Sequence, residues 1–114
     1  MTWTDTRAAL ATALDTADPK IRGHEFPPGG LGFGDAWPQL RSLVRGPGST
    51  WEAAWSIWVV LGADELVASK YFDDFVPLLM DALEPLVFID QVAPVTVQVS
   101  GGEVLALEIS ARSE

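Results

Sequence analysis

The stretch that decides the fold is Thr50-Trp51-Glu52-Ala53-Ala54-Trp55-Ser56-Ile57-Trp58-Val59-Val60-Leu61. Every second side chain from residue 51 onward is apolar, and a period of two is typical of a β-strand with one face on a core. We therefore predict a strand over residues 50–61 that contributes four large core side chains: Trp51, Trp55, Ile57 and Val59. Trp58 falls on the opposite face of this strand, where it is either covered by a helix or exposed for assembly.

The predicted strand has a hairpin partner before it, over residues 36–45. Gly46-Pro47-Gly48-Ser49 separates the two segments and is rich in turn-forming residues. Trp37, near the start of the first strand, is expected at an interface or packed at the sheet edge. Alternating apolar residues predict a second hairpin over 95–99 and 103–111, around Ser100-Gly101-Gly102, and residues 86–89 are a short strand or an ordered connector.

Two amphipathic helices complete the prediction. Residues 4–17 place Leu10 and Leu14 one turn apart, after a Thr2–Asp5 pair that resembles a capping box. Residues 65–83 follow Asp64, a good N-cap, and carry a broad apolar stripe: Ala68, Tyr71, Phe72, Phe75, Leu79 and Leu83. Pro77 either kinks this second helix or starts another short one.

The order of these elements is helix, hairpin, helix, hairpin. A mainly antiparallel sheet built from two hairpins, covered on one face by the two helices, would bury every apolar stripe. The sequence therefore predicts an α+β fold, and its 114 residues suit a single domain spanning 1–114.

A glycine-rich segment interrupts the first half of the chain. After a possible short strand over 20–26, the segment Pro27-Pro28-Gly29-Gly30-Leu31-Gly32-Phe33-Gly34 predicts a long surface loop. No Lys-Ser/Thr pair follows it, which disfavours a phosphate-binding loop. Leu31 and Phe33 form an apolar pair on this loop, and we expect them to meet a partner surface.

Composition excludes several classes of function. Seven Lys and Arg stand against sixteen Asp and Glu, for a net charge of −9, which argues against gripping nucleic acid or docking on anionic lipid. The chain lacks cysteine and has one histidine, so disulfides, thiolate metal sites and multi-histidine metal sites within one chain are excluded. The first residues do not resemble a signal peptide, and the apolar runs are too short to span a bilayer. We expect a soluble protein that is made in a cytosol.

Candidate catalytic groups do not converge. Asp73-Asp74 and Asp64-Glu65 are neighbours at a helix, where successive side chains point about 100° apart. His24 lies beside the glycine-rich loop, and the sequence contains no G-x-S-x-G nucleophile elbow. We interpret His24 as a surface residue at a strand end, and we expect no enzyme activity, no catalytic residues, no metal and no cofactor.

Charge is polarised along the chain. Seven acids lie between Asp64 and Asp90, where Lys70 is the single base. By contrast, Lys20, Arg22, Arg41 and Arg45 cluster in the first part of the chain, around Glu25 and Asp35. A basic strand edge of one copy and the acidic helix of another would attract each other in a ring. The alternative is a scatter of solvated charges.

Nearly the whole sequence resembles the small tail terminator proteins, also called tail completion proteins, of long-tailed actinobacterial phages. The resemblance lies in these segments: Trp3-Thr4-Asp5-Thr6-Arg7-Ala8-Ala9-Leu10, Gly34-Asp35-Ala36-Trp37-Pro38, Leu43-Val44-Arg45-Gly46-Pro47-Gly48, Trp58-Val59-Val60-Leu61-Gly62-Ala63-Asp64-Glu65 and Asp81-Ala82-Leu83-Glu84-Pro85. None of these segments is a chemical signature. The resemblance therefore rests on the order of the segments, the length of the chain and the local sequence of each segment.

The resemblance implies a virion protein, made in the host cytoplasm, that forms a hexameric ring at the head-proximal end of the tail tube. There it would stop tube polymerisation and join the tail to the head-tail connector protein, while DNA passes through the lumen without specific binding. Its expected contacts are the ring neighbour and the major tail tube protein, through Leu31, Phe33, Trp37, Arg41, Arg45, Pro47 and Trp58. Alternatives are a head-to-tail connector protein or an acidic binding module such as an immunity protein or chaperone.

Overall fold

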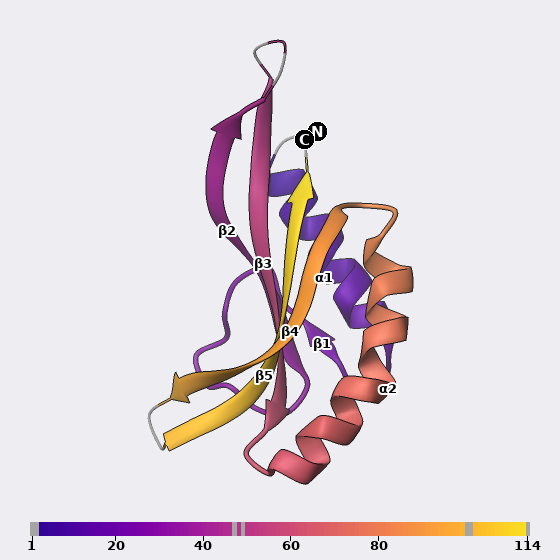
Figure 1. Ribbon diagram of the computed structural model, residues 1–114, viewed down its shortest axis with the longest axis vertical. Coiled ribbons are helices and arrows are strands. Elements are labelled where there is room, and N and C mark those ends of the chain that lie inside the picture. Colours follow the sequence, from indigo (N-terminus) through magenta and orange to yellow (C-terminus); the bar gives the residue numbers. More distant parts are fainter. Residues whose placement is uncertain (1–2, 47, 49, 100–101, 114) are drawn as a thin grey trace.

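Two helices lie on one face of a five-stranded sheet (Figure 1). The structure is a computed structural model that describes residues 3–46, 48, 50–99 and 102–113. Its elements follow in the order α1 (Trp3–Ala17), β1 (Arg22–Gly23), β2 (Asp35–Arg45), β3 (Trp51–Gly62), α2 (Glu65–Leu83), β4 (Phe88–Val99) and β5 (Gly102–Ser113). The strand order is β1-β2-β3-β5-β4; β1 is parallel to β2 and the other neighbours are antiparallel. The predicted α+β fold is confirmed.

The core lies between the helices and one face of the sheet. The side chains of Trp55, Ile57 and Val59 on β3 are fully buried there, as the period of two predicts. Leu10 and Leu14 of α1 cover them, together with an α2 stripe that includes Phe75, Leu79 and Leu83. The buried indole of Trp55 keeps a polar partner, since its Nε1–H donates to Ser113 Oγ at 2.8 Å.

The prediction that Trp51 belongs to the core is wrong. Its side chain shares a face with Trp55 but is 46% exposed. The reason is visible in Figure 1, where the end of the β2–β3 hairpin projects past the start of α1. The pattern of alternation continues along the strand, but the helices that would cover this last position stop short of it.

The strand predicted over 20–26 is much shorter. β1 contains only Arg22 and Gly23, and it pairs in parallel with Asp35 and Ala36. A side chain at Gly23 would overlap the carbonyl oxygen of Ala11, so β1 needs glycine to lie this close to α1. The following Pro27-Pro28 cannot donate backbone hydrogen bonds, and β1 has ended before them.

The C-terminal hairpin is longer than predicted, because residues 86–99 contribute one strand, β4, from Phe88 onward. A register shift between Ile89 and Gln91 and the presence of Pro94 both fit the position of β4 at the sheet edge. Val95 pairs with Ala106, so Val95 and Val97 face away from the helices. The expectation that the helices bury every apolar stripe is therefore wrong.

The second helix begins and ends as predicted. Asp64 caps it, with the Val67 N–H donating to Asp64 Oδ1 at 3.0 Å. Pro77 lies inside one continuous helix, so the alternative of a second short helix is excluded. For the first helix, the predicted Thr2 cap lies outside the described residues. No helix in the described part of the chain has the length and apolar character needed to cross a membrane.

Candidate functional site

The face of β2, β3, β5 and β4 that points away from the helices, called the open face below, carries the two tryptophans left undecided by the sequence. Trp37 and Trp58 are directly paired across β2 and β3. Their rings stack with centroids 6.5 Å apart, and the Trp58 Nε1–H donates to Gln39 Oε1 at 3.0 Å. Trp37 is buried and Trp58 is half-buried, so what covers Trp58 is a neighbouring tryptophan and not a helix.

A largely apolar cavity, called the tryptophan groove below, opens beside this pair. Its volume is about 430 Å³, and it is lined by Arg7, Phe26, Pro27, Trp37, Pro38, Gln39, Leu40, Trp58 and Val97. These residues come from α1, the loop after β1, and strands β2, β3 and β4. Segments that are far apart in sequence therefore build one site at the β2 edge of the sheet.

Arg7 fixes one wall of the tryptophan groove. Its guanidinium lies 4.5 Å from the ring centroid of Phe26 and 5.5 Å from that of Trp55. It also donates to the backbone carbonyl oxygens of Pro38, at 3.1 Å, and Glu25, at 3.3 Å. Sequence reasoning missed Arg7 as a site residue. Its spacing of three from Leu10 on α1 was the available signal, since that spacing places it on the helix face that meets the core.

The projecting end of the first hairpin carries a second set of predicted contact residues. Arg45 pairs with Trp51 across the strands, and its guanidinium lies 4.6 Å from the Trp51 ring centroid. The neighbouring Val44 is 55% exposed. We call Val44, Arg45 and Trp51 the hairpin arm. Arg41 is exposed nearby, at the register shift between Leu40 and Ser42, and the predicted contact residue Pro47 lies outside the described residues.

The glycine-rich loop packs against its own chain. The ring centroid of Phe33 lies 4.5 Å from that of Tyr71 and 6.2 Å from that of Phe75, both on α2. Phe33 remains 37% exposed, and Leu31 is half-buried. A contact of these two residues with a partner stays a prediction, now limited to the part of Phe33 that α2 leaves uncovered.

Asp35 holds this loop to the sheet. Its carboxylate accepts from the Gly32 N–H at 2.8 Å, and it lies 3.1 Å from both Arg22 Nη2 and His24 Nε2. Burial raises the pKa of Asp35, but the hydrogen bonds from Gly32 and His24 and the positive charge of Arg22 outweigh it, so the pKa lies below its ordinary value. His24, predicted as a strand-end surface residue, is part of this structural cluster.

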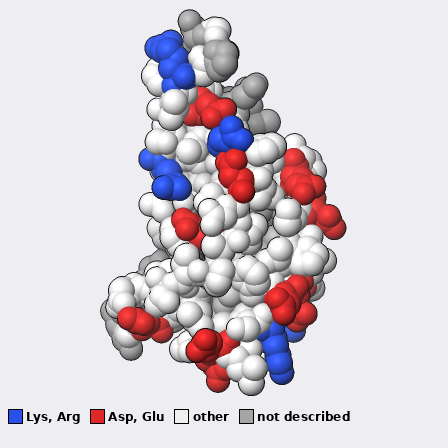
Figure 2. Space-filling view, in the orientation of Figure 1, with Lys and Arg blue, Asp and Glu red and all other residues white. Residues whose placement is uncertain are grey.

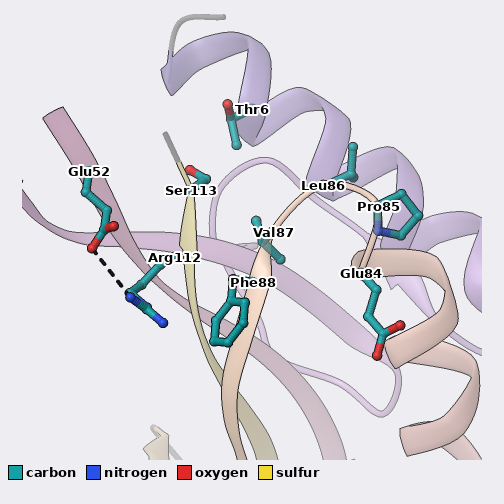
Figure 3. A pocket seen from close by; sticks show the side chains of 9 residues that line it. All are labelled: Thr6, Glu52, Glu84, Pro85, Leu86, Val87, Phe88, Arg112 and Ser113. Carbon is teal, nitrogen blue, oxygen red and sulfur yellow. Dashed lines mark ion pairs between the residues drawn. The ribbon is translucent and has the colours of Figure 1, made fainter. Parts of the chain in front are cut away.

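A second cavity lies where the start of α1, the end of β5 and the α2–β4 connection meet (Figure 3). It measures about 650 Å³ and is lined by Thr6, Glu52, Glu84, Pro85, Leu86, Val87, Phe88, Arg112 and Ser113. Arg112 lies 2.9 Å from Asp90 and 3.9 Å from Glu52, and these carboxylates, Asp90 above all, raise its pKa. Its guanidinium also lies 4.7 Å from the Phe88 ring centroid. The guanidinium of Arg112 in this cavity is therefore already paired with the carboxylates of Asp90 and Glu52.

The acidic side chains of α2 lie on its solvent side. Asp73, Asp74 and Asp81 are exposed, as the helical pattern predicts. Within the described residues, no three His, Cys, Asp or Glu side chains gather in a way that would hold a metal ion. The residues that the structure brings together are thus aromatic, around the tryptophan groove, and cationic, on the hairpin arm.

Two comparisons with known proteins identify no relative of this chain. No protein-family model matches the chain, and no curated protein matches it significantly.

Proposed function

We propose that this chain is a ring-forming structural subunit at the head-proximal end of a phage tail tube, where it stops tube polymerisation and joins the tail to the head connector. Its sequence resembles the tail terminator proteins over nearly its whole length. The α+β fold with two hairpins and two helices suits such a subunit. Both hairpins extend from the part of the sheet that the helices cover (Figure 1), so they can reach neighbouring copies.

The observation that carries the proposal is the separation of charge on the folded surface. Figure 2 shows Lys and Arg side chains over the β2–β3 hairpin at the upper left, with acidic side chains close by, and Asp and Glu side chains along the right edge over α2, with a basic group below them. Arg41 and Arg45 are the exposed cations of β2, while Asp73, Asp74 and Asp81 are exposed on α2. One chain thus presents its exposed cations and its acidic helix on different parts of its surface, which suits a ring subunit whose neighbour contacts and lumen wall are separate surfaces.

In this proposal α2 faces the lumen of the ring. Six copies with a net charge of −9 each would carry roughly −54 in total. Carboxylates on the lumen wall repel the phosphates of DNA, so the DNA slides through without binding. The hairpin arm then remains available for contacts between neighbouring copies.

The test is a tube-length assay with the major tail tube protein of the same phage. When the chain is added during polymerisation, we expect shorter tubes, and electron micrographs should show a ring at one tube end. The double variant Arg41→Glu, Arg45→Glu should lose this effect, whereas Lys70→Glu, a matched charge reversal on α2, should keep it. Unchanged tube lengths with the chain left in the supernatant would refute the proposal.

The same preparation separates the alternatives. Binding to head connector rings without any change in tube length indicates a head-to-tail connector protein. A one-to-one complex with a basic toxin, seen by light scattering, indicates an immunity protein. Either result replaces the tail terminator function.

A further inference from the structure

We infer that the tryptophan groove receives the hairpin arm of a second copy of this chain, with Trp51 entering the groove and Arg45 facing the carboxylates at its rim. This inference rests on the proposed function, because it specifies the contact that would build the ring. It assigns a binding site to the open face and names its occupant.

The groove is suited to an aromatic side chain. Trp37 and Trp58 present stacked rings, and Phe26, which lies on its rim, is 62% exposed. The polar groups are already satisfied, since the Trp58 N–H is bonded to Gln39 and Arg7 donates to two backbone carbonyls. An occupant therefore needs apolar surface and few hydrogen-bonding groups of its own.

Charge at the rim favours a cation beside that aromatic ring. Glu108 is the ladder partner of Trp58 on β5, and Glu25 precedes Phe26 in the loop and is exposed. The hairpin arm offers the complementary set, with Trp51 and Arg45 in contact on one face of the hairpin and Val44 exposed on its other face. The groove has one cation of its own, Arg7, against the two carboxylates, so the arm and the groove match both in apolar character and in sign.

The contact has to form between copies. The Arg45–Trp51 pair and the Trp37–Trp58 pair belong to the same β2–β3 ladder, eight residues apart on β2. At the rise of a β-strand they are separated by about 25 Å, and the paired strands between them keep them apart. Because the arm and the groove are different surfaces, each copy can give its arm to one neighbour and accept an arm from another. Repetition of such a contact closes a ring or extends a filament.

Strand addition is a less suitable way to join copies. The open edges of the sheet are β4 and the part of β2 that follows its short pairing with β1. Each contains a proline and a register shift: Pro38 and the shift at Arg41, Pro94 and the shift at Asp90. Both features interrupt the row of backbone groups that a further strand would need. Contact through side chains, as in the arm and the groove, avoids this obstacle.

Disulfide trapping tests the contact directly, because the chain has no cysteine of its own. The double variant Arg45→Cys, Val97→Cys places one thiol beside Trp51, on the same face of the arm, and one in the groove. After mild oxidation of tubes capped with this variant, we expect a ladder of covalent multimers on a non-reducing gel. The control Arg45→Cys, Leu66→Cys, with the second thiol exposed on α2, should give no ladder.

Assembly strength gives a second readout. Trp51→Ala should raise the concentration for half-assembly at least about thirtyfold, as for a central aromatic contact residue. Leu66→Ala, which removes an exposed apolar side chain from α2, should leave it unchanged. Thermal melting of both variants shows whether the monomer remains folded.

The two proposals fail in different ways. Rings that cap tubes but give no ladder from the Arg45→Cys, Val97→Cys variant overturn the arm-in-groove contact and leave the proposed function standing. A chain that neither shortens tubes nor appears at their ends refutes the proposed function, and the inference with it.

Discussion

Trp51 and Trp55 lie four residues apart on β3 and share one face of the sheet, yet their surroundings are opposite. Trp55 is fully buried beneath the helices, whereas Trp51 is 46% exposed beyond them. The identity of the residue and the alternation of the strand are the same in both cases. What differs is whether a helix covers the position, and this decides which tryptophan stabilises the monomer and which is available to a partner.

Trp55→Ala should lower the free energy of unfolding by about 3–5 kcal/mol, since it leaves a cavity and removes the partner of Ser113. Trp51→Ala should cost less than about 1 kcal/mol, because most of its ring contacts are with Arg45 at the surface. Urea titrations followed by circular dichroism measure both values. Equal losses for the two variants would contradict the placement of the hairpin arm outside the core.

At the scale of elements, the loop between β1 and β2 is held by contacts that no periodicity predicts. Asp35, the first residue of β2, binds the Gly32 N–H, Arg22 and His24. Gly34 adopts a positive φ of 84°, and a side chain there would overlap the carbonyl oxygen of Lys20. The loop therefore returns tightly onto β1, and Phe33 reaches α2 from it.

The loop cluster should make stability depend on pH. The pKa of Asp35 is lower in the folded chain than its ordinary value of 3.8, so ionised Asp35 stabilises the fold above that value. This stabilisation is lost as the pH falls through the lowered folded pKa. We expect Asp35→Asn to be about 1–3 kcal/mol less stable than the wild type at pH 7. In urea titrations from pH 7 to pH 2, the difference should shrink below about pH 4. A difference that stays constant over this range would contradict the role of the carboxylate charge.

At the scale of the whole molecule, the chain is elongated, with extents of 46 × 28 × 20 Å. The acidic helix and the basic hairpin occupy different parts of this shape (Figure 2). In the proposed ring, this separation would let one chain perform two tasks: contact its neighbours through the hairpin arm and repel DNA from the lumen wall with α2.

The triple variant Asp73→Lys, Asp74→Lys, Asp81→Lys tests the second task. It should still shorten tubes, because its hairpin arm and tryptophan groove are intact. Tubes capped with it should retain duplex DNA at low salt and release it when salt screens the charges, whereas wild-type capped tubes should retain none. Co-sedimentation of labelled DNA with the tubes measures this. Equal retention by both proteins would place α2 away from the lumen.

The sequence by itself determined the type of each element, because the patterns that report it are local. Three such patterns depend only on neighbours within a few positions of the chain. They are the alternation along residues 51–61, the Asp64 cap and the helical stripe with Phe75 and Leu79. The core residues Trp55, Ile57 and Val59 follow from this alternation, and the acidic outer side of α2 follows from the helical pattern. Trp37 and Trp58 were recognised as candidate contact residues because large aromatic side chains off the core face need another partner.

The tertiary structure alone decided how far each element extends under its neighbours and which distant residues meet. Trp51 is exposed because α1 begins short of the hairpin tip, and the register of β4 on β5 turns Val95 to the open face. The tryptophan groove combines Arg7, Phe26, Trp58 and Val97, which lie up to ninety residues apart in the chain. Register and helix placement come from the sum of many weak long-range contacts, so no single local pattern encodes them.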